Sequence, residues 1–168
     1  MASVWGSTMS VRRAVLGDEA IVRDLRLRAL ADAPDAFDST LERESAMAPS
    51  DWSRWISSGA TFLFEHPDGP RGIAAGVLYD GEPDAVLLIS MWVDPAFRGS
   101  GAADALVASV IAWAESEGAA EVVLHVGKAN ARARRFYERI GFRLVGEEFV
   151  SPGNRIVEVE MRVALGRK

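Results

Sequence analysis

The chain has 168 residues, no cysteine, two histidines and a formal net charge of −5 at pH 7. Without cysteine, disulfides, thiolate catalysis and cysteine-ligated zinc are excluded, and two histidines do not make a multi-histidine metal centre. The mild negative charge argues against a general nucleic-acid binder and suits a cationic substrate.

Neither a membrane span nor a secretory signal is expected. The longest apolar run, residues 85–93, is interrupted by Ser90 and is far shorter than the ~20 residues that cross a bilayer. The N-terminus lacks a basic start and an apolar stretch. We therefore expect a cytoplasmic protein with a flexible leader over residues 1–9, which could stem from cloning, and with Met9 as a candidate native start.

The N-terminal third of the chain predicts one strand and two helical stretches. A short strand is expected over residues 11–16. Asp18 follows a glycine and can accept hydrogen bonds from first-turn amides, so it is expected to cap a helix over residues 19–31. A second helical stretch is expected over residues 39–58. It is interrupted at Pro49, and Ser50 or Asp51 is expected to cap the helix that begins after the interruption.

The rest of the chain predicts strands joined by short turns and then alternating elements. Three strands that short turns join as antiparallel neighbours are expected over residues 61–66, 72–79 and 85–93. After them, a helix is expected over residues 102–117, a strand over 121–126 and a helix over 130–140. A closing hairpin is expected from two strands over residues 142–150 and 155–164. The sequence therefore predicts one α/β domain, residues 10–168, with a mixed, mostly antiparallel sheet that has a central parallel pair and is flanked by helices.

The stretch FRGSGAAD, residues 97–104, follows the central strand and opens a helix. Gly99 and Gly101 allow positive φ and let a ligand approach the backbone. The first amides of the helix would then face a phosphate group, with Arg98 as a charged donor beside them. An ordinary turn at a helix start explains the same pattern.

Two nucleotide-binding motifs do not fit this stretch. A Walker loop requires GK[ST], and no lysine follows these glycines. A dinucleotide-binding fingerprint requires a third glycine where Asp104 stands. A nucleotide-dependent oxidoreductase is therefore a distant alternative.

Two motifs in order resemble the GCN5-related N-acetyltransferase (GNAT) family. The cofactor signature of that family, Q/R-x-x-G-x-G/A, is matched by Arg98, Gly101 and Ala103. The second motif, N-x-x-A-x-x-x-Y followed by G-F, is matched by Asn130, Ala133, Tyr137, Gly141 and Phe142. The resemblance covers about residues 85–142 and implies a GNAT fold, in which two central parallel strands splay apart around acetyl-CoA.

The resemblance implies acetyl-CoA as co-substrate and no metal. By analogy, the pyrophosphate lies on the amides of the glycine turn and the pantetheine arm runs beside the end of the central strand. The implied cofactor-binding residues are Met91, Trp92, Val93, Arg98, Gly99, Ser100, Gly101, Ala102, Ala103, Asn130 and Arg132. Arg132 also belongs to a stripe with Arg135 and Arg139 that is typical of a solvated helix face.

The resemblance also implies the catalytic residues. Tyr137 matches the general-acid position and would protonate the leaving thiolate, although its helical face also suits a core residue. Some relatives carry a glutamate where this chain has His125, whose ordinary pKa of ~6.5 suits proton acceptance. A water chain relayed by peripheral acids is the alternative base. Asp80, Glu82 and Asp84 lie in the expected loop between two central strands, too remote for direct contact with the substrate.

The implied function is direct transfer of acetyl from acetyl-CoA to a primary amine of a small molecule or peptide. Trp52 and Trp55 could wall the amine site by cation–π contact, or they could pack the core. A non-catalytic acyl-CoA-binding sensor on the same fold is the alternative from another class. The resemblance leaves a homodimer open, and neither nucleic acid nor membrane is expected as a partner.

Overall fold

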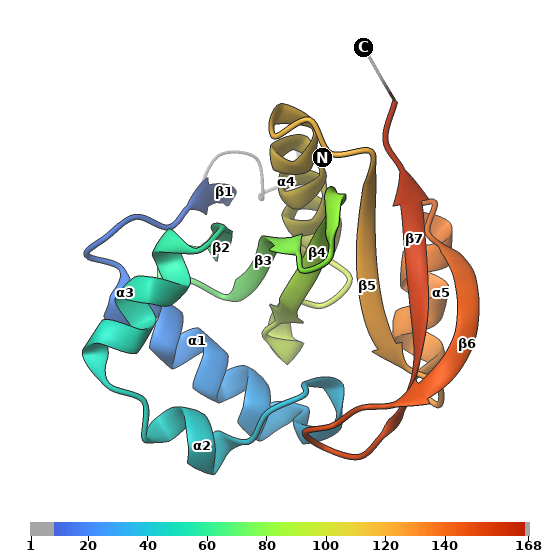
Figure 1. Cartoon of the computed structure of the whole chain (residues 1–168). Helices are drawn as coiled ribbons and strands as arrows, with labels where there is room; N and C mark the ends of the chain where they lie inside the picture. The colour runs from blue at the N-terminus through green and yellow to red at the C-terminus, as the bar shows by residue number, and fades with distance from the viewer. Residues whose placement is uncertain (1–8, 167–168) are drawn as a thin grey trace, which may run out of the picture.

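The computed structural model describes residues 9–166, which form a seven-stranded sheet with helices on both faces (Figure 1). The strands are β1 (Ser10–Arg13), β2 (Ala60–Glu65), β3 (Gly72–Tyr79), β4 (Glu82–Val93), β5 (Glu121–Gly127), β6 (Arg143–Val150) and β7 (Val157–Ala164). The α-helices are α1 (Glu19–Asp32), α2 (Leu41–Ser45), α3 (Pro49–Ser57), α4 (Ala102–Ser116) and α5 (Ala131–Arg139). Two short 3-10 helices are η1 (Pro34–Ala36) and η2 (Pro95–Phe97).

The sheet has the order β1-β2-β3-β4-β5-β7-β6, and β4 and β5 are its parallel pair. The other neighbouring strands pair antiparallel. The predicted α/β fold, with a mixed sheet and one central parallel crossover, is therefore confirmed. Of the leader expected over residues 1–9, all but Met9 lies outside the described residues.

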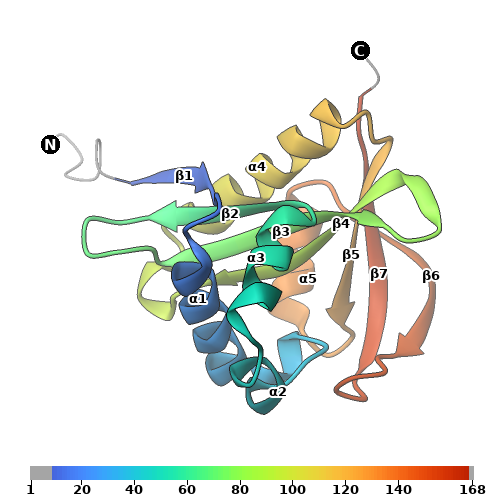
Figure 2. The same cartoon turned by 60° about the vertical axis from the view of Figure 1, so that its left-hand side comes forward.

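A hydrophobic core lies on each face of the sheet, because side chains of a strand alternate between the faces. Phe64 and Ala74 belong to the core that α4 covers, whereas Leu63 and Ile73 belong to the core that α1 and α3 cover. Figure 2 shows α1 and α3 on the opposite side of the sheet from α4. The sheet is thus covered on both faces around β3 and β4.

The central strands β4 and β5 pair only near their beginnings. Their register runs from Ala85 opposite Glu121 to Leu87 opposite Val123. Beyond this point β4 stays paired with β3 and β5 stays paired with β7, so the two strands diverge (Figure 1). The register of β4 against β3 shifts near Ser90, which has a φ of 58°, as a β-bulge produces.

The structure corrects two predicted helix caps. Asp18 is the N-cap residue of α1, as predicted, but its carboxylate accepts from no first-turn amide; it accepts from the Val15 amide at 2.8 Å and pairs with Arg12. The second helical stretch divides into α2 and α3, and α3 begins at the proline that was expected to interrupt it. Its N-cap is Ala48, whose amide donates to Asp51 at 2.8 Å. Proline fits the first helical position because its missing N–H needs no partner there.

Within residues 9–166, no helix has the length and apolar character needed to span a membrane.

Candidate active site

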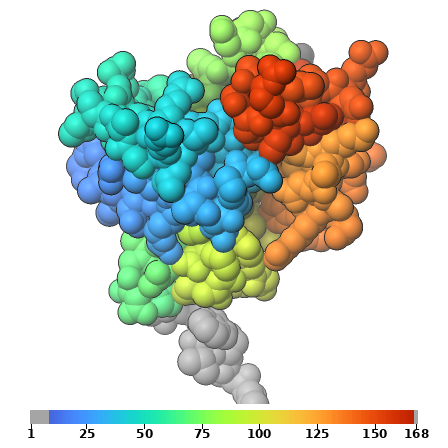
Figure 3. Space-filling view, turned by 90° about the horizontal axis from the view of Figure 1, so that it is seen from below, coloured from blue at the N-terminus to red at the C-terminus, as the bar shows by residue number. Residues whose placement is uncertain are grey.

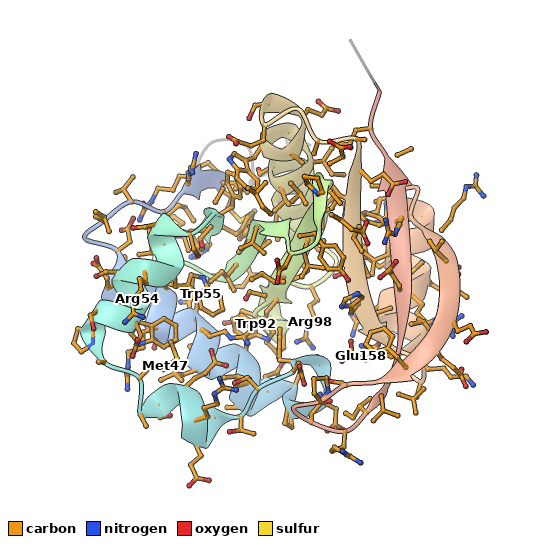
Figure 4. The ribbon with its side chains drawn as sticks, in the orientation of Figure 1. Met47, Arg54, Trp55, Trp92, Arg98 and Glu158 are labelled. Carbon is orange, nitrogen blue, oxygen red and sulfur yellow. The ribbon has the colours of Figure 1, made fainter. Side chains whose placement is uncertain are left out.

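A cavity of about 470 Å³ lies where β4 and β5 diverge. Its middle wall consists of Leu87–Met91 from β4 and Leu124–Gly127 from β5. Helix α1, the segment near η1 and helix α3 line one side, and the β6–β7 hairpin and α5 line the other. Figure 4 shows Trp55 on the α3 side and Glu158 on the β7 side.

The cavity brings together several of the residues that the sequence singles out, among them Trp55 and the motif residue Ala133, whereas Trp52 is buried in the core. Met91, His125, Asn130 and Tyr137 also line the cavity. Asn130 caps α5, because its side chain accepts from the Ala133 amide at 3.2 Å. The predicted residues of the glycine turn lie outside this lining.

The glycine turn has the backbone that the sequence predicts. Gly99 and Gly101 have φ angles of 80° and 90°, which other residues rarely adopt. A Cβ atom at either position would meet no atom within 4 Å, so the turn faces open space. No side chain caps α4, and the first amides of a helix have no acceptor inside it. This arrangement fits a phosphate group.

Arg98 makes two hydrogen bonds beside the glycine turn. Its Nε donates to the Val93 carbonyl at 3.2 Å and its Nη2 donates to Asp32 at 2.5 Å. Asp32 also accepts from the Trp92 indole at 3.0 Å, and these two hydrogen bonds hold the pKa of its carboxyl below its ordinary value. The Trp92 ring packs in the core that α1 covers, whereas Arg132 lies exposed at the start of α5.

Tyr137 packs in the core and also lines the cavity. Its ring lies between Phe136 and Phe142, with centroid separations of 5.1 and 5.6 Å. Burial raises the pKa of its phenol, which therefore keeps its proton at neutral pH. A packed phenol on a cavity wall is held in place and has a proton to donate.

His125 belongs to a polar network on the cavity side of the sheet. Its Nε2 lies 3.1 Å from a carboxylate oxygen of Glu160 and 3.4 Å from the Tyr79 hydroxyl. Arg162 donates to Glu160 at 2.7 Å and to Glu82 at 2.8 Å. The chain of contacts therefore links His125 to Glu82, one of the acids expected in a water chain, while Asp80 and Asp84 are exposed.

A buried ion pair that the sequence did not reveal forms another wall. Arg26 of α1 donates to Glu44 of α2 through Nε at 2.8 Å and through Nη2 at 3.1 Å. Its Nη1 donates to the Ser90 hydroxyl at the β4 bulge, and its guanidinium lies over the rings of Phe37 and Trp55. Arg26 and Glu44 are only 6% and 3% exposed. Two features of the sequence could have indicated the pair. Arg26 is a charged residue among the apolar residues of α1, and Ser90 is a polar residue within the apolar run of β4.

Asp38 connects two distant segments beside the cavity. Its carboxylate accepts from the Ser151 hydroxyl and from the Asn154 amide, while the Asn154 side chain donates to the Phe37 carbonyl at 2.9 Å. Seen from below, the segment around η1 lies against the turn between β6 and β7 (Figure 3). These contacts close one side of the cavity. No local pattern in the sequence indicates them, because the partners are more than 110 residues apart.

Residues 27–142 match the Acetyltransferase (GNAT) family. This match covers more than half of the chain and includes both motifs, and the chain belongs to that family. The resemblance predicted from the sequence is thus confirmed. Within residues 9–166, histidine, aspartate and glutamate side chains form no group of three or more that could hold a metal ion.

Individual relatives agree with this assignment. An uncharacterized N-acetyltransferase of Mycobacterium tuberculosis is 38% identical over 76 residues, which cover 45% of this chain and 49% of the relative. Mycothiol acetyltransferase of Thermobispora bispora is 32% identical over 133 residues, which cover 74% of this chain and 43% of the relative. The chain spans about half the length of the curated relatives that it matches.

Solved structures share the fold at low sequence identity. The yncA structure from Salmonella typhimurium, which contains its cofactor acetyl-CoA, has a TM-score of 0.79 at 20% identity and covers 96% of each chain. A GNAT-family acetyltransferase from Streptococcus pneumoniae has a TM-score of 0.80 at 17% identity, covering 94% of this chain and 99% of that one. These similarities show the GNAT fold.

Proposed function

We propose that the chain is an acetyl-CoA-dependent N-acetyltransferase that passes acetyl directly to a primary amine of a small molecule or peptide. The observation that carries the proposal is the cavity between the diverging strands β4 and β5, with Tyr137 and His125 in its walls. Membership of an acetyltransferase family supports it. We place the protein in the cytoplasm, where acetyl-CoA is available.

The proposed cofactor site combines the glycine turn with the diverging strands. The free amides at the start of α4 would hold the pyrophosphate, since a helix N-terminus attracts anions. Met91 and the backbone of Trp92 and Val93 would lie beside the pantetheine arm, and Asn130 would contact it from α5. Arg98 would reach the phosphates only by leaving Asp32, so we assign it a second role in tying the turn to α1.

Acetyl-CoA supplies the thioester whose acetyl group moves to the amine. As the amine nitrogen bonds to the acetyl carbon, the carbon–sulfur bond breaks and its electron pair stays on sulfur. In our proposal His125 takes the proton that the amine loses, and the Glu160 carboxylate beside Nε2 stabilises the imidazolium that forms. Tyr137 gives its phenolic proton to the sulfur.

A non-catalytic acyl-CoA sensor on the same fold remains the second candidate. The phenol of Tyr137 in the cavity wall supports an enzyme, because a sensor has no leaving group to protonate. Relatives include mycothiol acetyltransferase and N-acetylaspartate synthetase, and their names indicate that acceptors differ widely between relatives.

The test combines cofactor binding with turnover. Acetyl-CoA should raise the melting temperature of the protein, because a ligand that binds only the folded state stabilises it, and NAD should not. Release of CoA is then followed against polyamines, aminoglycosides, amino acids and short peptides, with a blank that lacks acceptor. Acceptor-dependent release supports the enzyme, whereas stabilisation without release for any amine supports the sensor.

A further inference from the structure

The ionisable side chains that line the cavity do not balance in charge. The cationic Arg26 is matched by Glu44, which accepts two of its hydrogen bonds. The carboxylate of Asp38 is occupied by donors from the β6–β7 turn. Glu158 lines the same cavity and has no ion-pair partner within residues 9–166. The Ser151 hydroxyl, which also donates to Asp38, hydrogen-bonds the Glu158 carboxylate, but a hydroxyl carries no charge to balance it.

The β-sheet register aims Glu158 into the cavity. On β7 it lies opposite Gly127 at the end of β5, two residues before Glu160, which lies opposite His125. Side chains two residues apart on a strand share a face, so Glu158 lies on the face that carries His125. The side chain is partly buried, and burial is the largest cause that raises the pKa of its carboxyl.

A partly buried carboxylate without a cationic partner is costly, and a bound cation relieves that cost. Aromatic rings of Phe37, Trp55 and Phe149 line the same cavity. They offer an apolar wall for an alkyl chain, and Trp and Phe faces also attract ammonium groups. The cavity therefore combines apolar walls with a carboxylate that no cation of the described residues neutralises.

We propose that Glu158 binds a second ammonium group of the acceptor, which makes diamines and related polycationic amines the preferred substrate class. This inference rests on the proposed function, because it takes the cavity to be the acceptor site. One amine, uncharged, reacts beside Tyr137, while the other, protonated, pairs with Glu158. A rival class, amines that carry a carboxylate, would have to use Arg26, whose Nε, Nη1 and Nη2 already donate to Glu44 and Ser90.

The test compares three acceptors whose carbon chains match and whose tails differ in charge: putrescine, butylamine and γ-aminobutyrate. Their binding to the whole protein is measured by calorimetry in the presence of CoA, so that no turnover is needed. Putrescine should bind about tenfold or more tighter than butylamine, as one charged hydrogen bond implies. Glu158→Gln should abolish this preference. Glu147→Gln, which removes the same charge from an exposed position on β6, should preserve it.

Equal binding of putrescine and butylamine, or a preference that survives in Glu158→Gln, overturns the inference. Tightest binding of γ-aminobutyrate also overturns it and assigns the acceptor tail to Arg26. Other outcomes separate a failure of the proposed enzyme activity from a failure of the proposed role of Glu158. Putrescine-selective binding without any CoA release contradicts the enzyme but keeps the role of Glu158, whereas acetylation of both amines at equal rates contradicts only that role.

Discussion

Asp38 accepts a hydrogen bond from the backbone N–H of Asn154, 3.1 Å away and 116 residues later in the chain. This contact joins the segment between α1 and α2 to the turn between β6 and β7, and both segments line the cavity. Gly153 belongs to the same contact, since a Cβ there would lie 2.2 Å from the Asp38 carboxylate. The Asp38 carboxylate therefore helps to hold one side of the proposed acceptor site in place.

Replacing Asp38 by alanine should loosen this side of the cavity. The donors of Ser151 and Asn154 lose their acceptor, so we expect a loss of about 1–3 kcal/mol of stability and a higher KM for the amine but not for acetyl-CoA. Asp35→Ala, in the exposed helix η1, is the matched control. Steady-state kinetics and thermal melts check both variants. If Asp38→Ala and Asp35→Ala had the same KM for the amine, the contact between Asp38 and the β6–β7 turn would have no role in acceptor binding.

Glu44→Gln should be strongly destabilising. It leaves the buried Arg26 guanidinium without its counter-charge, and breaking a buried ion pair from one side typically costs about 3–5 kcal/mol. Urea denaturation measures the loss. Arg26→Met combined with Glu44→Met removes both charges and should restore much of the stability. A double variant no more stable than Glu44→Gln would show that the charges are not the cause.

Gly101→Asp should abolish acetyl-CoA binding. The new carboxylate would lie at the start of α4, where the proposed site holds the pyrophosphate, and like charges repel. Gly118→Asp provides the control, because Gly118 follows the other end of α4 and also has a positive φ, 78°. Both variants carry the same type of backbone strain, but only the first should lose affinity in calorimetry. Normal affinity of Gly101→Asp would refute the cofactor site.

Tyr137→Phe should slow acetyl transfer by about a hundredfold or more while leaving acetyl-CoA affinity nearly unchanged. The phenyl ring keeps its packing between Phe136 and Phe142, and only the proton donor is lost. Tyr79→Phe removes the other tyrosine hydroxyl of the chain and should have a much smaller effect on kcat. Unchanged kcat of Tyr137→Phe over a range of pH would remove Tyr137 from the mechanism.

Glu158 should make stability depend on pH. Burial raises the pKa of its carboxyl in the folded state, so the folded protein binds this proton more tightly than the unfolded chain. The contribution to the free energy of unfolding therefore falls as pH rises from the ordinary glutamate pKa of about 4.3 through the raised folded pKa, and stays low above it. Glu158→Gln should melt at a higher temperature than the unchanged protein at neutral pH, with a smaller gain at acidic pH. A lower melting temperature at neutral pH would contradict this assignment.

Local patterns predicted most of the fold. Apolar strands, short turns and the change to alternating elements after residue 93 predicted the order of elements, and β3 has the predicted bounds. The predicted side-chain caps of α1 and α3 failed because a side chain can satisfy a competing donor nearby, as Asp18 does with Arg12 and the Val15 amide.

The site was predictable only where it is local in sequence. The positive φ angles of Gly99 and Gly101 and the place of Tyr137 follow from motifs of a few residues. The residues of the proposed acceptor site do not follow from local motifs, because contacts between segments far apart in the sequence bring them together. Glu158 reaches the cavity through the register of β7 against β5, and the charge of Arg26 is paired by Glu44, which lies on a different helix.

The most direct test of the central claim is mass spectrometry of an amine panel incubated with the protein and isotopically labelled acetyl-CoA. The account predicts enzyme-dependent labelling of a primary amine, with CoA released in equal amount and with labelling strongly reduced in Tyr137→Phe. It would be contradicted if acetyl-CoA binds but no amine in the panel is labelled, or if Tyr137→Phe labels amines as fast as the unchanged protein.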